Sequence, residues 1–276
     1  MKIFIHIYRY LNIDVVAGTL SGLYFASRLL GVTISGNVYL LLALAVYLIY
    51  LLDHLYDAIQ GGKGETARDQ FYQKNWKFFV ISGIALLVTC IILMFTIPPD
   101  VRTTGLIISA LCLVYFTGIY YAGHKKWFLK EILIALIYTL AIWSIPVMKA
   151  ETYPLKFLLP VIIPYYLLVL INVLIYSYFQ YDKDRLAKKN SIVQILDKKR
   201  SKNLILVLCT SVIMLLIPAN FFFEGIISRG IVLLYFIMSL VMSWVLREEH
   251  TFARHHRYAY VTDAVFFLPF LAALFL

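Results

Sequence analysis

The stretch NVYLLLALAVYLIYLLDHLYDA, residues 37–58, determines what kind of fold this chain can adopt. Residues 37–52 carry no charge, and Asp53 and Asp57 then follow one helical turn apart. About 20 apolar residues let a helix cross a bilayer, so the stretch predicts a transmembrane helix. A carboxylate near hydrocarbon is costly, and the two aspartates therefore need a physical reason.

The rest of the chain repeats this apolar pattern. Of its 276 residues, 62% are hydrophobic and only 14% are charged, which predicts an all-α polytopic membrane protein forming one domain over residues 1–276. Lys2, His6 and Arg9 come early, but no cleavable signal pattern follows, so we expect the first helix to remain. The pattern divides into about nine spans: 11–32, 37–58, 77–97, 104–122, 131–149, 156–179, 203–220, 226–246 and 259–276.

The net charge of +10 has a one-sided distribution along these spans. With the N-terminus inside, twenty Lys and Arg residues fall on the inner side and five on the outer side. This is a positive-inside pattern, and it predicts a cytoplasmic N-terminus and inner loops. The basic charge is thus explained by topology, without a nucleic-acid partner. In a bacterium, the membrane would be the plasma membrane.

The sequence argues against a cysteine-based disulfide or metal site and against a phosphate-binding loop. Cys90, Cys112 and Cys209 lie in apolar spans at unrelated spacings, which favours packing over a disulfide or metal site. The segment GGKGE, residues 61–65, lacks the spacing of a phosphate-binding loop. We interpret it as a flexible connector that can close over a site at the inner face.

The acids gather at two inner helix ends. Asp53 and Asp57 end the second span, and Asp182 and Asp184 end the sixth, where Gln180 precedes Asp184 by four residues. A spacing of four places both members of a pair on one helical face, where like charges repel. Mg²⁺ is usually held by one or two carboxylates plus substrate phosphates, so a shared ion would relieve the repulsion.

The basic residues beside the second acid cluster indicate an anion as well as a cation. Lys183, Arg185, Lys188 and Lys189 would repel a bare cation but suit a metal-bridged diphosphate. The plain alternative is that both clusters are solvated charges at helix ends. Two clusters with the same residue type, spacing and membrane side favour the metal interpretation.

In these residues the chain resembles the UbiA superfamily of intramembrane prenyltransferases. The family's first motif, N-x-x-x-D-x-x-x-D, matches at Asp53 and Asp57, with Ile49 in place of asparagine. Its second, D-x-x-x-D-x-x-x-G-x-x-T, matches at Asp184 and Ser191, with Gln180 and Lys188 as departures. YYAGHKKWFLKE and YRYLN are similar to two further family segments. The resemblance implies helices around a central cavity.

The resemblance also implies a transferase of prenyl groups. An isoprenyl diphosphate would ionise and alkylate an aromatic or other lipophilic acceptor drawn from the membrane lipid phase. The implied metal ligands for Mg²⁺ are Asp53, Asp57, Gln180 and Asp184, of which the three aspartates are the catalytic set. The implied substrate-binding residues are Lys125, Lys126, Arg185, Lys189, Tyr50, Tyr176, Arg9 and Asn12.

The departures from the motifs leave alternatives open. Without an aspartate at Gln180, one metal site is weaker or altered, and the chain is a divergent transferase, a terpene cyclase that needs no acceptor, or a member without catalysis. A lipid or small-anion transporter or binding protein is the alternative from another class. It would require an inverted repeat and charges near the midplane, and the sequence has neither feature.

Three further polar residues have two interpretations each. His54 is either a general base or a residue that caps the helix or meets lipid headgroups. Asp14 and Asp263 begin the first and ninth spans, and they either line a substrate pocket or form interhelical polar pairs, for example between Asp14 and a basic residue.

Overall fold

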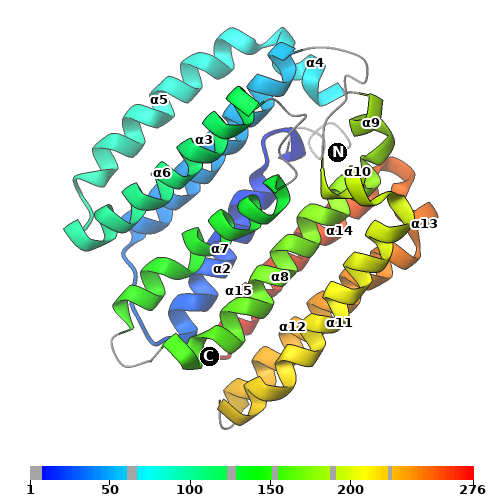
Figure 1. Cartoon of the computed structure of the whole chain (residues 1–276). Coiled ribbons are helices and arrows are strands. Elements are labelled where there is room, and N and C mark those ends of the chain that lie inside the picture. The colour runs from blue at the N-terminus through cyan, green and yellow to red at the C-terminus, as the bar shows by residue number, and fades with distance from the viewer. Residues whose placement is uncertain (1–7, 61–66, 123–128, 151–154, 187–190, 223–225) are drawn as a thin grey trace.

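The computed structural model describes residues 8–60, 67–122, 129–150, 155–186, 191–222 and 226–276. Within this part the secondary structure is helical throughout, and no strand is present. The long helices run side by side along one direction and form a bundle (Figure 1). The predicted all-α class is confirmed.

The described helices fall into three groups: long helices of the bundle, the segments at the end of the chain, and shorter connecting helices. The long ones are α2 (Ile13–Leu29), α3 (Gly36–Gln60), α5 (Trp76–Met94), α6 (Pro99–Ala122), α7 (Lys130–Lys149), α8 (Leu155–Phe179), α11 (Lys198–Phe222) and α12 (Ile226–Arg247). The chain ends in α14 (Arg257–Ala264), η2 (Val265–Phe267) and α15 (Leu268–Ala273). Shorter connecting helices are α4 (Ala67–Lys74), α9 (Tyr181–Leu186), α10 (Ile192–Leu196), α13 (Glu249–Ala253) and η1 (Arg254–His256).

Seven of these helices are long and apolar enough to cross a membrane: α3, α5, α6, α7, α8, α11 and α12. They match seven of the predicted spans, and the protein is an integral membrane protein. The predicted number of nine is not confirmed, because the first and ninth predicted spans fall outside this set. α2 has only 17 residues, between Asn12 and Leu30.

The ninth predicted span is interrupted near its middle. Pro269 has no amide hydrogen to donate to Val265, and the chain is a 3₁₀ helix over η2 just before it. Ser21 of α2 occupies the break: its hydroxyl accepts a hydrogen bond from the Phe270 amide at 2.8 Å and donates to the Phe267 carbonyl at 3.4 Å. The interruption is therefore also the place where α2 is bonded to the end of the chain.

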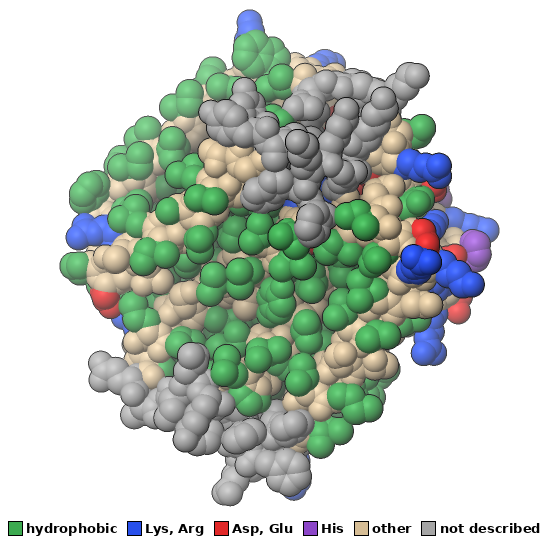
Figure 2. Space-filling model, viewed as in Figure 1, with side chains coloured by type: hydrophobic (Ala, Val, Ile, Leu, Met, Phe, Trp, Pro, Cys, Tyr) green, Lys and Arg blue, Asp and Glu red, His purple; other side chains and the backbone are tan. Residues whose placement is uncertain are grey.

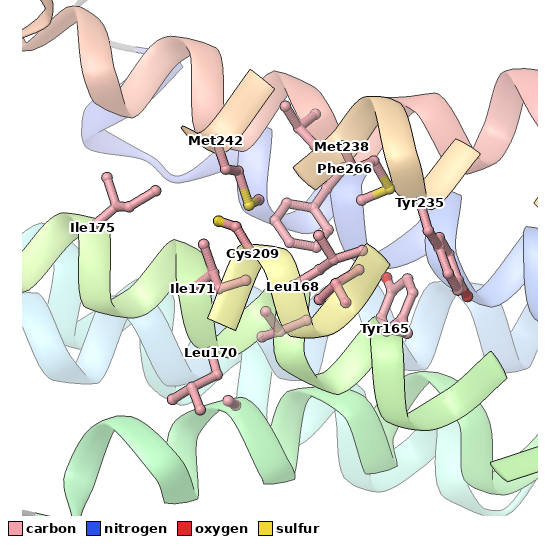
Figure 3. Close-up of a cluster of buried hydrophobic side chains, with 14 of the residues drawn as sticks. Tyr165, Leu168, Leu170, Ile171, Ile175, Cys209, Tyr235, Met238, Met242 and Phe266 are labelled. Carbon is pink, nitrogen blue, oxygen red and sulfur yellow. The ribbon is translucent and has the colours of Figure 1, made fainter. Parts of the chain in front are cut away.

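The largest core surrounds α8, which packs against α7, α11 and α12. Figure 3 shows Leu168 and Ile171 of α8 beside Cys209 of α11 and Met238 and Met242 of α12. The three cysteines are free and buried, which agrees with the packing role expected for them.

The opposite side of the bundle presents apolar side chains outward. α5 and α6 carry exposed large apolar residues along much of their length, among them Phe78, Ile81, Ile92, Leu113 and Val114. Figure 2 shows apolar side chains over the middle of one face and charged ones towards its margins. A surface of this kind is unstable in water but is the expected contact with lipid chains.

Candidate active site

The helix ends that carry the predicted acids lie at one end of the bundle. α3 leads towards α4 and α8 leads into α9, and Figure 1 places α4 and α9 at the same end. The Lys183 ammonium lies 3.6 Å from the Asp69 carboxylate, so α9 and α4 are joined by an ion pair. Two segments more than a hundred residues apart in sequence therefore share one polar region.

The individual acids differ in exposure. The side chain of Asp53 is about half exposed, at 49%, whereas Asp184 is buried and its neighbour Asp182 is exposed. The Asp184 amide donates to the Gln180 carbonyl at 2.9 Å, so the helical register continues across the junction of α8 and α9. Gln180 and Asp184 thus keep the one-turn spacing expected from the sequence, and Arg185 is exposed beside them.

Several predicted site groups fall outside the described part of the structure. They are the side chain of Asp57 and the whole of Lys125, Lys126 and Lys189. Among the side chains that are described, no three His, Cys, Asp or Glu residues gather closely enough to hold a metal ion by themselves. Of the four predicted metal ligands, the side chains of Asp53, Gln180 and Asp184 are described. The Gln180 side chain is hydrogen-bonded to Tyr258.

His54 is buried between polar neighbours. Its Nε2 atom lies 3.1 Å from Asn12 Oδ1 and 3.3 Å from an Arg68 nitrogen, and its Nδ1 atom lies 3.8 Å from Asp53. Its ring also contacts the edge of Tyr72. This environment fixes the orientation of His54 and links α3 to the start of α2 and to α4, which does not match a headgroup contact at the surface.

α4 is held against its surroundings by side-chain bonds. Tyr72 donates a hydrogen bond to the Tyr10 carbonyl at 2.8 Å, and Gln73 donates to the Ala58 carbonyl at 2.8 Å. Arg68 lies 3.7 Å from Asp69, which in turn pairs with α9. α4 therefore connects the end of α3, the N-terminal segment and α9.

A second polar cluster lies deeper in the bundle, around Arg9. Its guanidinium donates to the Tyr176 hydroxyl at 3.0 Å and lies 3.6 Å from Asp263 and 3.8 Å from Asp14. Burial lowers the pKa of Arg9, but Tyr176, Asp263 and Asp14 together raise the pKa above its ordinary value, so Arg9 stays charged. The cation also lies over the Tyr260 ring, 4.2 Å from its centre. Asp14 therefore has a basic partner in Arg9, and Asp263 of the last helices shares that partner.

Three tyrosines face this cluster from separate helices. Tyr50 of α3, Tyr138 of α7 and Tyr176 of α8 each lie within electrostatic range of Asp263. Each is partly buried. Tyr50 lies within electrostatic range of Asp53, at the end of the bundle that carries the predicted acids and is called the mouth below. It is also within range of Asp263 in the Arg9 cluster, so it lies between the two polar regions.

One face of α8 connects the two regions. Asn172, Tyr176, Gln180 and Asp184 follow each other at intervals of four residues, which places them in one row along the helix and its continuation. Asn172 donates to Asp263 at 3.3 Å, and Tyr176 donates to the other oxygen of the same carboxylate. The row thus leads from the predicted metal ligands at the mouth to the Arg9 cluster.

Glu131 is a fully buried carboxylate that the sequence analysis did not single out. It accepts a hydrogen bond from Ser177 at 3.2 Å and another from the Ile192 amide in the first turn of α10. Ser191 caps the same helix by accepting from the Gln194 amide at 3.1 Å. Glu131 and Ser191 therefore both position α10. In the sequence, Glu131 was marked only by being a carboxylate at the border of an apolar span.

Two surface hollows of about 440 Å³ each lie apart from this site. One lies between α3, α4 and α5 and is bordered by Leu55, Ala58, Tyr72 and Trp76. The other lies at the opposite end of the bundle, beside Lys149. Neither is lined by Asp53, Asp184 or the Arg9 cluster, so we do not assign the candidate site to either.

The sequence matches no protein-family model and no curated protein. The fold, in contrast, matches solved structures over nearly the whole chain. A UbiA homologue from Archaeoglobus fulgidus bound to GPP and Mg²⁺ aligns with a TM-score of 0.68 at 13% identity, covering 97% of this chain and 99% of that one. The apo structure of a UbiA homologue from Aeropyrum pernix K1 aligns with a TM-score of 0.67 at 15% identity, covering 96% and 98%.

A third solved structure is of a synthase. Digeranylgeranylglyceryl phosphate synthase aligns with a TM-score of 0.58 at 15% identity, covering 97% of this chain and 94% of the synthase. At identities this low, the alignments establish the fold. The chain has the fold of the UbiA homologues, as the resemblance in its motifs implied, with sequence divergence throughout.

Proposed function

We propose that this protein is a Mg²⁺-dependent intramembrane prenyltransferase, which moves an isoprenyl group from an isoprenyl diphosphate to an aromatic or other lipophilic acceptor. The observation that carries the proposal is the meeting of α3 and α9, through α4, at one end of a bundle of long apolar helices. Support comes from structural neighbours that are bound to DMAPP or GPP together with Mg²⁺.

The oxygen donors at the mouth suit Mg²⁺. Asp53, Asp57 and Asp184 would hold the ion, and Gln180 offers a neutral oxygen. Mg²⁺ keeps water and substrate phosphates among its ligands, so a site made from two helix ends needs no closed protein cage. When bound, the ion supplies positive charge that offsets the charge developing on the leaving diphosphate.

The remaining side chains would bind the two ends of the substrate. Lys125, Lys126, Arg185 and Lys189 contact the diphosphate oxygens, with Arg9 and Asn12 deeper in the pocket. The faces of Tyr50 and Tyr176 stabilise the allylic cation after ionisation. The isoprenoid tail lies among apolar side chains within the membrane, and the mouth opens on the cytoplasmic side, with the N-terminus.

Release of diphosphate tests the proposal. Purified protein in detergent is incubated with Mg²⁺ and a panel of isoprenyl diphosphates, with and without an extract of native lipid. We expect Mg²⁺-dependent diphosphate release and a prenylated lipid product. Asp184→Asn and Asp57→Asn are expected to reduce release by about 100-fold or more, the scale on which losing one charge-stabilising group acts.

The exposed neighbour Asp182 provides the matched control. Asp182→Asn removes the same charge from α9 but from its exposed side, so its release rate should stay close to that of the unchanged protein. Product analysis separates the other candidate functions. A cyclic terpene formed without acceptor would indicate a cyclase, and binding without any release would indicate a carrier or binding protein.

A further inference from the structure

The hollow at the end of the bundle opposite the mouth has a polar lining. It encloses about 440 Å³ between the segment before α3, the segment before α6 and the end of α7. The described residues that line it supply an ammonium group, an amide and three hydroxyls but no carboxylate: Lys149, Asn37, Thr33, Ser35 and Thr96. All of these groups can donate hydrogen bonds, so the hollow is suited to an anion.

The walls of this hollow are held in place by contacts between the segments that form it. Val38 of α3 and Val101 of α6 line the hollow and are buried with Ile145 of α7 in one apolar cluster. Asn37 donates a hydrogen bond to the Thr96 hydroxyl at 3.1 Å, which joins the start of α3 to the chain between α5 and α6. Binding to a preformed site requires less ordering of the protein.

Three donors of the lining remain available to a ligand. Within the described part of the chain, no carboxylate lies within ion-pair distance of Lys149, and the hydroxyls of Thr33 and Ser35 have no hydrogen-bond partner. A cation in the last turn of a helix is favoured by that helix's own carbonyl groups, which is the plain explanation for Lys149. That explanation does not account for hydroxyls from two other segments around the same hollow.

The hollow lies at the boundary of the membrane. Three membrane-crossing spans end beside it: the span of α3 begins at Gly36, that of α6 begins at Pro99, and that of α7 ends at Lys149. Lipid headgroups lie at this level, and basic pockets between membrane helices bind them. Leu40, about one turn further into the span of α3, is 47% exposed, so an acyl chain can lie against the helix below the hollow.

We propose that this hollow binds the phosphate group of an anionic phospholipid from the leaflet opposite the mouth. The Lys149 ammonium pairs with the phosphate, and the hydroxyls of Thr33 and Ser35 donate hydrogen bonds to its oxygens. A lipid with a net negative charge is favoured because the lining has one cation without an acidic partner. The inference is independent of the prenyltransferase function, since it requires neither Mg²⁺ nor turnover.

A tryptophan beside the hollow can report its occupant. Phe95 precedes the lining residue Thr96 and is 76% exposed, so Phe95→Trp adds a fluorescent ring there without altering the core. The full chain is reconstituted in phosphatidylcholine vesicles with a rising share of brominated phosphatidylglycerol, or of brominated phosphatidylcholine as reference. Bromine quenches tryptophan on contact, and the chain without the reporter gives the signal of the native tryptophans for subtraction. We expect phosphatidylglycerol to quench the reporter at a smaller share of the lipid.

Removal of the lysine tests the source of this preference. In the reporter chain, Lys149→Gln should lower the preference for phosphatidylglycerol by about fivefold, the attraction that one basic residue near a membrane surface gives to anionic lipid. Arg229→Gln is the matched control, because Arg229 is exposed, begins the span of α12 at the same end of the bundle and lines neither hollow (Figure 1). Its preference should equal that of the reporter chain. An unchanged preference in Lys149→Gln would overturn the proposal, as would an equal loss in both variants.

A charge placed on another wall of the hollow gives a second test. The Ser35 carbonyl accepts a hydrogen bond from the Val38 amide at 3.0 Å, and at this position before a helix Asp and Asn are both favourable. Ser35→Asp adds a carboxylate that should pair with Lys149 and abolish the preference for phosphatidylglycerol, whereas Ser35→Asn should keep most of it. Equal preferences in these two variants would contradict a phosphate in the hollow. Relief of the quenching by inorganic phosphate would assign the hollow to free phosphate and overturn the lipid as its ligand.

Discussion

At the scale of single residues, Gly22 shows how closely α2 approaches the core. A Cβ atom at this position would overlap the Tyr165 hydroxyl and lie 3.0 Å from Ile142 Cδ1. Tyr165 and Ile142 are completely buried, so neither has free space into which to move. The absence of a side chain at Gly22 therefore sets the distance between α2 and the helices behind it.

We predict that Gly22→Ala destabilises the protein. Overpacking of a dense core typically costs about 1–3 kcal/mol, which here exceeds the gain in helix propensity. The measurement is the apparent melting temperature of the purified protein in detergent. Gly105→Ala is the control: nothing lies within 4 Å of its added Cβ in α6, so it should leave the melting temperature unchanged or raise it.

The residue scale also shows what the sequence could not predict. The motifs identified Asp53, Asp184 and Tyr176 as candidates, and Arg9 through a separate pattern. Nothing in the periodicity linked Arg9 to Asp263, because 254 positions separate them and their contact exists only once the first and last helices meet. Glu131 was missed for a related reason, since its partners Ser177 and Ile192 come from distant segments.

At the scale of elements, the predicted bounds of the long apolar helices agree closely with those in the structure. The predicted span 37–58 is part of α3 (Gly36–Gln60), and the predicted span 156–179 ends with α8 at Phe179. The short helices α4 and α9 were not predicted, because they are polar and derive their stability from bonds to other segments. The interruption at Pro269 was also missed, since its consequence depends on the hydroxyl of Ser21.

The ion pair between Asp69 and Lys183 joins α4 to α9, and we predict that it positions the metal ligands. Lys183 precedes Asp184, so a looser α9 should weaken Mg²⁺ binding. Asp69→Ala and Lys183→Ala are each expected to raise the Mg²⁺ concentration needed for half-maximal diphosphate release by up to about fivefold, since a partly exposed ion pair contributes at most about 1 kcal/mol.

A double-mutant cycle distinguishes this positioning role from independent effects. If the ion pair is responsible, the double variant should need no more Mg²⁺ than the single variants do, while the maximal release rate stays similar. Additive losses in the double variant would contradict the prediction, because they would show that the two residues act separately.

At the scale of the whole molecule, the distribution of basic residues predicts orientation. Twenty of 25 Lys and Arg residues fall on the side that carries α4, α9 and α13 under the predicted topology. The native cysteines are all buried, so an introduced cysteine can report its own side. Asp197 and Asp100 are exposed at opposite ends of membrane-crossing helices.

We predict that Asp197→Cys in intact cells reacts with a membrane-impermeant thiol reagent only after permeabilisation. Asp100→Cys, at the start of α6, should react without it, because the opposite side of the bundle faces outward. The measurement is the labelled fraction of each variant before and after permeabilisation. The reverse pattern would place the N-terminus and the candidate site on the outer side.

The position of both acid-bearing helix ends at one end of the bundle has a consequence for energetics. In the proposed reaction the ion and the diphosphate both enter and leave at that end of the bundle, and neither travels from one compartment to the other. Turnover then performs no electrical work against the membrane potential. A cell could depolarise or hyperpolarise its membrane without changing the driving force of this reaction.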